Sequence, residues 1–135
     1  MTLALRIDDF AKAERPERVA AIEAGLPVKM LRVVMRDYGF TLANLAGLIA
    51  PRRTLERRLE NSERLNLEES ERLARLMRML DLAAEIFKDP AWVRDWLSKP
   101  KRTLGGRVPL DLMRTEEGGR VLEEKLLQLK YGIYA

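Results

Sequence analysis

Apolar residues recur at three- and four-residue spacing along most of the chain, and this spacing is typical of amphipathic helices. In the first half it predicts helices over residues 15–24, 27–38 and 42–48. Gly25 and Gly39 follow the first two helices as stop signals. Pro27 stands at the first position of the second helix, where its missing N–H costs nothing, and Thr41 can cap the third.

The second half follows a polar segment at residues 61–66, where we place the domain boundary. Asn66 and Glu69 have the spacing of a capping box at the start of a long apolar helix. Further helical segments are predicted at 67–87, from Pro90, at 109–113 and from Thr115 to Leu129. The pattern therefore predicts an all-α fold, with an N-terminal helix-turn-helix domain over residues 1–64 and a C-terminal helical domain over residues 65–135.

Three apolar features of the sequence indicate burial, either in the core of this chain or against a partner. The helix over 67–87 has a broader apolar face than one small domain easily covers, so we expect it to form a homodimer interface. Trp92 and Trp96 lie four residues apart and are predicted to be core anchors, with partner binding as the alternative. The tail over 131–135 has no charged side chain, which suggests docking on this chain's own core or on another protein.

Four arginines crowd the helix that begins at Pro51, where Leu55 and Leu59 mark the buried side. The short helix before it and the tight turn between them complete a helix-turn-helix with a basic second helix. Such a recognition helix places its N-terminal residues in the DNA major groove. We expect base contacts from Arg53, Thr54 and Arg57, and phosphate contacts from Arg52 and Arg58. The alternative is a solvated basic face on an ordinary helical hairpin.

Positive charge is concentrated in the N-terminal half of the chain. Residues 29–59 contain seven basic and two acidic residues, whereas residues 66–135 contain 13 basic and 12 acidic residues. This local surplus suits contact with a phosphate backbone.

The composition excludes several classes of function. The chain has neither histidine nor cysteine, so the usual zinc ligands and the Ser-His and Cys-His nucleophilic arrangements are missing. Its acidic residues are scattered through helical patterns, so we expect no enzyme activity, metal site or cofactor. No apolar run is long enough to span a membrane, residues 1–10 lack an export signal, and the absence of cysteine fits the cytoplasm.

Several short motifs, in this order and spacing, resemble the antitoxins of the Xre–RES, ParS and MbcA group of bacterial type II toxin–antitoxin modules. The N-terminal motifs are Gly25-Leu26-Pro27 and Arg53-Thr54-Leu55 with Arg57-Arg58-Leu59. The C-terminal motifs are Leu104-Gly105-Gly106, Pro109-Leu110-Asp111-Leu112 and Tyr131-Gly132.

The resemblance implies two functions in one chain. The helix-turn-helix would bind operator DNA and repress its own operon, and the C-terminal region would neutralise a cognate toxin, of the NAD-degrading RES type in the RES group. Toxin contacts are expected at Leu104, Gly105, Gly106, Pro109 and Leu112 and in the tail at Tyr131, Gly132, Ile133 and Tyr134. A helix-turn-helix regulator without a toxin, or a helical adaptor without a nucleic-acid role, are the alternatives.

Overall fold

The computed structural model describes residues 6–132, and every regular element in that range is helical, as predicted. The elements are α1 (Ile7–Lys12), α2 (Arg15–Ala24), α3 (Lys29–Tyr38), α4 (Leu42–Leu45), α5 (Arg52–Asn61), α6 (Leu67–Phe87), α7 (Pro90–Ser98), the 3-10 helix η1 (Arg102–Leu104), α8 (Pro109–Leu112) and α9 (Glu116–Tyr131). None of these described helices is both long and apolar enough to cross a membrane.

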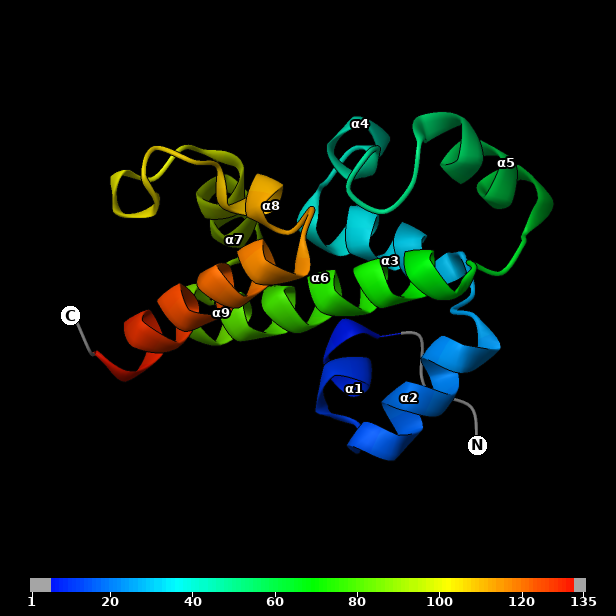
Figure 1. Cartoon of the computed structure of the whole chain (residues 1–135), viewed down its shortest axis with the longest axis horizontal. Helices are drawn as coiled ribbons and strands as arrows, with labels where there is room; N and C mark the ends of the chain where they lie inside the picture. The colour runs from blue at the N-terminus through cyan, green and yellow to red at the C-terminus, as the bar shows by residue number, and fades with distance from the viewer. Residues whose placement is uncertain (1–5, 133–135) are drawn as a thin grey trace.

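Helix α6 runs through the middle of the molecule, and α1, α2, α7 and α9 pack against it (Figure 1). Its apolar side chains, including Leu73, Leu76, Met77 and Leu80, are completely buried within the chain. The expectation that this face forms a dimer interface is therefore wrong, because the chain's own helices cover it. One hydrophobic core extends from α1 to α9 through α6.

Side-chain caps start four of the described helices, at Thr41, Asn66, Asp89 and Thr115. The Asn66 side chain accepts a hydrogen bond from Glu69 N, and the Glu69 carboxylate accepts one from Asn66 N, which completes the capping box of α6. Asp89 caps α7 and Thr115 caps α9 in the same way, through their side-chain oxygens. These bonds satisfy N–H groups that a helix cannot satisfy internally.

Three predicted boundaries are wrong by a few residues. Helix α3 begins at Lys29, because Pro27 instead lies in a bridge with Arg64, beside the hydrogen bond from Leu65 N to Leu26 O. Helix α4 ends at Leu45, because the chain turns sharply at Gly47, whose φ is 79°. Pro51 was predicted to be the first residue of α5, but it occupies the N-cap, and the helix begins one residue later at Arg52.

The structure also contains one helix that was not predicted, and one tryptophan that was predicted to be buried is exposed. Helix α1 was not predicted; its Ile7 and Phe10 are buried, and the helix packs on α6. Trp92 is 59% exposed and stacks on Phe87 at a centroid distance of 6.0 Å, so it is not the buried anchor that its spacing predicted. Trp96 is partly buried against the same phenylalanine.

Candidate nucleic-acid interface

Helices α4 and α5 form a fixed unit around a short apolar turn. Thr41 and Asn44 make a capping box at the start of α4, and Gly47 N donates to Ala50 O across the turn. The apolar residues of the turn and Leu55 of α5 are buried in the common core. The orientation of α5 is therefore set by the core.

Two arginines from the second half of the chain hold this turn from outside. Arg72 of α6 donates from Nη1 to Ile49 O at 3.2 Å, and Arg114 donates from Nη1 to Gly47 O at 3.1 Å. These bonds satisfy carbonyl groups in a turn that has no regular secondary structure. They tie the helix-turn-helix to α6 and to the segment between α8 and α9.

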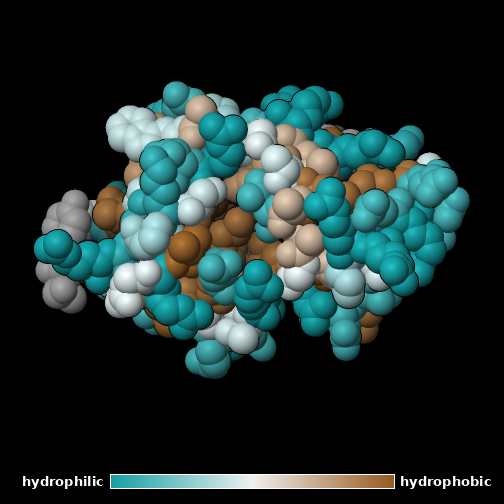
Figure 2. Space-filling view, turned by 90° about the horizontal axis from the view of Figure 1, so that it is seen from above, coloured by the Kyte–Doolittle hydropathy of each residue, from teal (hydrophilic) through white to brown (hydrophobic). Residues whose placement is uncertain are grey.

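The outward face of α5 carries three of the four predicted arginines. Arg52, Arg53 and Arg57 are exposed, and Thr54 lies beside them with partial exposure. Arg52 Nε lies 3.6 Å from Glu56, and Arg57 Nε lies 3.5 Å from Glu63; Arg53 has no carboxylate within 4 Å among residues 6–132. Hydrophilic side chains cover the end of the molecule that carries α5 (Figure 2).

The position of these charges on α5 is unfavourable for the isolated helix. The first turn contains two arginines and no acidic residue, next to the partial positive charge of the helix N-terminus. Both features attract anions, because the free N–H groups of a helix N-terminus and the guanidinium groups are positively polarised or charged. The arrangement is suited to phosphate contact.

Arg58 lies on the inward side of α5, and its expected phosphate contact is not supported. Its side chain is only 14% exposed and forms ion pairs with Glu63 at 3.1 Å and with Glu69 at 2.7 Å. The guanidinium therefore joins α5 to the start of α6 and has a structural role.

The expected partner-binding residues divide into covered and exposed groups. Pro109 and Leu112 are buried in the packing of α8 and do not offer a contact surface, which corrects the prediction for both. Leu104 is partly exposed, and Gly105 and Gly106 are exposed at the tip of a turn closed by the hydrogen bond from Lys101 N to Arg107 O.

The start of the tail is exposed on α9. Tyr131 is 65% exposed and Gly132 is exposed, while Ile133 and Tyr134 lie outside the described residues. The turn at 104–106 and the end of α9 both lie at the end of the molecule remote from α5 (Figure 1). Trp92 adds a large exposed aromatic surface, and its exposure fits the partner-binding alternative better than the predicted role of core anchor.

Two family models match adjacent parts of the chain. The antitoxin Xre-like helix-turn-helix domain matches residues 17–78, and the antitoxin Xre/MbcA/ParS C-terminal toxin-binding domain matches residues 82–132. The two matches meet inside α6, whereas the sequence pattern placed the boundary in the polar segment before that helix.

Three relatives are similar over about the same length of chain. Two proteins named Antitoxin Xre, from Pseudomonas putida and Yersinia enterocolitica, are 37% and 36% identical over 62% and 63% of this chain. A protein named Prs ADP-ribosylating antitoxin, from Sphingobium sp., is 36% identical over 61% of it. The alignments span little more than half of these relatives, 53%, 58% and 57% of their lengths.

Proposed function

This chain belongs to the Xre/MbcA/ParS group of antitoxins, and we propose that it neutralises a cognate toxin by direct binding and represses its own operon through α5. The observation that carries the proposal is the separation of two surfaces on one continuous hydrophobic core. Exposed arginines of a helix-turn-helix lie at one end, and exposed aromatic residues of the matched toxin-binding domain lie at the other. Both matched domains have binding roles, and neither is catalytic.

On DNA, Arg53, Thr54 and Arg57 are proposed to face base edges, with Arg52 on a phosphate. Arginine can donate two hydrogen bonds to a guanine in the major groove, which specifies sequence, whereas phosphate contacts fix position. One short helix offers few base contacts, so a two-fold dimer is proposed, with operator half-sites one or more turns of about 10 base pairs apart.

The DNA proposal is tested with an Arg53→Ala, Arg57→Ala double variant. Each base-contacting arginine contributes about 1–3 kcal/mol of discrimination, so the variant should lose selective retardation of its own promoter DNA. The matched control is an Arg102→Ala, Arg107→Ala variant, because those arginines are exposed at the other end of the molecule. Normal promoter retardation by the α5 variant would refute the recognition-helix assignment.

The toxin is proposed to be of the NAD-degrading RES type, with the antitoxin tail lying near the toxin's nucleotide cleft. Support comes from the matched toxin-binding domain and from the exposed, uncharged Tyr131 at the start of the tail. Aromatic anchors often dominate interface energies. The Sphingobium relative carries a name that refers to Prs ADP-ribosylation, so the competing proposal is a toxin of that class.

The toxin proposal is tested with a chain that ends at Lys130, expressed beside the cognate toxin. The shortened chain should fold and retard operator DNA, but it should neither protect cells nor prevent loss of NAD. Full protection would place the toxin contact on the turn around Leu104 and Gly105 instead. If the toxin arrests growth without loss of NAD, and the full chain relieves this arrest, the toxin belongs to a class other than RES.

A further inference from the structure

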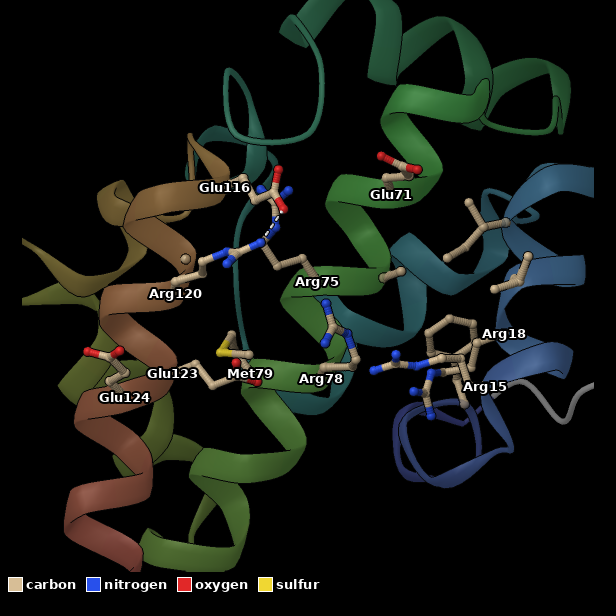
Figure 3. A pocket seen from close by; sticks show the side chains of 15 residues that line it. Arg15, Arg18, Glu71, Arg75, Arg78, Met79, Glu116, Arg120, Glu123 and Glu124 are labelled. Atoms are coloured by element: carbon tan, nitrogen blue, oxygen red, sulfur yellow. Dashed lines mark hydrogen bonds and ion pairs between the residues drawn. The ribbon is translucent and has the colours of Figure 1, made fainter. Parts of the chain in front are cut away.

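A groove of about 600 Å³ lies between α2, α6 and α9 (Figure 3). Its apolar lining comes from Phe10, Ile22, Ala74 and Met79, and Val19, which also lines it, is 46% exposed. Apart from Gly119, the rest of the lining is charged, and the two signs are unevenly distributed. None of these residues belongs to α5 or to the exposed aromatic end, so the proposed DNA and toxin contacts leave the groove unused.

One side of the groove is an arginine bank formed by Arg15 and Arg18 of α2 and Arg78 of α6. The three side chains approach one another across the space between the two helices (Figure 3). None of them has a carboxylate within 4 Å among the described residues. Burial lowers the pKa of Arg78, and nearby arginines lower it further, although Glu123 acts in the opposite direction. Arg18 donates from Nη1 to two backbone carbonyl groups at the end of α1. Positive charge, partly desolvated at Arg78, is therefore concentrated here without a carboxylate within 4 Å among the described residues.

The other side is a carboxylate bank formed by Glu123 and Glu124 of α9. Glu123 extends toward α6, whereas the Glu124 carboxylate lies at the outer edge of the groove and is directed away from the arginine bank (Figure 3). Neither carboxylate has a basic group within 4 Å in the described part of the chain. Glu116 belongs to the same helix, but it is paired with Arg120 at 3.1 Å. The groove thus has an excess of positive charge on one bank and an excess of negative charge on the other.

We propose that a second copy of this chain occupies the groove, with the carboxylate bank of each copy facing the arginine bank of the other. A two-fold axis makes any interface self-complementary, because each contact occurs twice with the roles exchanged. Two opposite banks across one groove satisfy that requirement, whereas a purely acidic partner would use only one. Nucleic acid would meet the carboxylates of α9. The inference rests on the proposed dimer and identifies its surface.

The test uses two charge-reversed variants and measures mass by light scattering at micromolar concentration. Arg15→Glu, Arg78→Glu makes both banks negative, and Glu123→Arg, Glu124→Arg makes both banks positive. The wild-type chain should have twice the 15.6 kDa mass of one chain, and each variant alone should dissociate at least tenfold more readily. An equimolar mixture of the two variants should recover the dimer, because both contacts then pair opposite charges.

Misfolded variants could not form a dimer when they are mixed. Recovery of the dimer on mixing therefore keeps the test decisive even if one variant is less stable. Arg53→Glu on α5 is the matched control and should leave the dimer unchanged while abolishing operator binding. A monomeric wild-type chain, or a mixture of folded variants that stays monomeric, would overturn the inference. Variants that remain dimeric would place the dimer interface elsewhere, without affecting the antitoxin proposal.

Discussion

Arg58 Nε lies 2.7 Å from Glu69 Oε1, and this ion pair joins the predicted recognition helix to the first turn of α6. Both side chains are nearly buried, with exposed fractions of 14% and 6%. The same Glu69 carboxylate accepts a hydrogen bond from Asn66 N, so one acidic side chain starts α6 and anchors α5. The direction of α5 and the start of the central helix are thereby coupled.

Removing one partner of this pair should destabilise the whole fold. Arg58→Ala leaves the Glu69 carboxylate buried with its main counter-charge gone, and breaking a buried pair in this way costs about 3 kcal/mol. Urea unfolding should show this loss, whereas Arg53→Ala, which removes an exposed side chain, should change the free energy of unfolding by about 0.5 kcal/mol or less. Equal effects of the two substitutions would contradict the structural role of Arg58.

Operator binding by the Arg52→Ala variant should depend less steeply on salt. Each phosphate contact releases bound counterions, so losing one should make the slope of log K against log salt concentration shallower by about 0.9. The loss should be similar on operator and unrelated DNA. Arg107→Ala provides the comparison and should keep the wild-type slope. A loss confined to the operator would instead assign Arg52 to a base.

Tyr38 should make the fold sensitive to alkaline pH. Burial, reinforced by Asp81, Asp37 and Asp8, raises the pKa of its phenol to about 12 from an ordinary value of 10.0. Folding therefore favours the neutral phenol. The folded state keeps its full stability below pH 10 and loses stability as the pH rises toward 12, because the unfolded chain ionises first. At pH 11 the loss is about 1 kcal/mol. Unfolding measured at pH 8 and pH 11 should show this difference in wild type and a smaller one in Tyr38→Phe.

Gly118 should be intolerant of a side chain although it lies in a helix. A Cβ at this position would overlap the Leu112 carbonyl oxygen, which is backbone and cannot move without shifting α8. Gly118→Ala should therefore cost about 3 kcal/mol in urea unfolding. Gly119→Ala is the matched control, since its Cβ would meet the Arg75 side chain at 2.9 Å and no backbone atom at such a distance. Its cost should be about 1 kcal/mol or less, because alanine favours helix more than glycine does.

Local chemistry in the sequence determined where several of the helices begin or end. Asn66 with Glu69, Thr115 and Gly39 act within one turn of their own helix, so their effects do not depend on the rest of the chain. The same holds for the basic character of α5, whose leucine spacing placed Arg52, Arg53 and Arg57 outside. Helical periodicity identified these faces correctly because α5 has only one buried side.

Tertiary packing decided which polar and apolar residues remain exposed. Arg58 turned inward because Glu63 and Glu69 lie beside it in space, and Leu112 became core because α8 packs against α9. Trp92 stayed exposed because α7 buries Val93 and Leu97 instead. The groove between α2 and α9 unites residues more than 100 positions apart in the chain. Periodicity fixes the angle of a side chain about its own helix, whereas only the packing of helices fixes what lies at that angle.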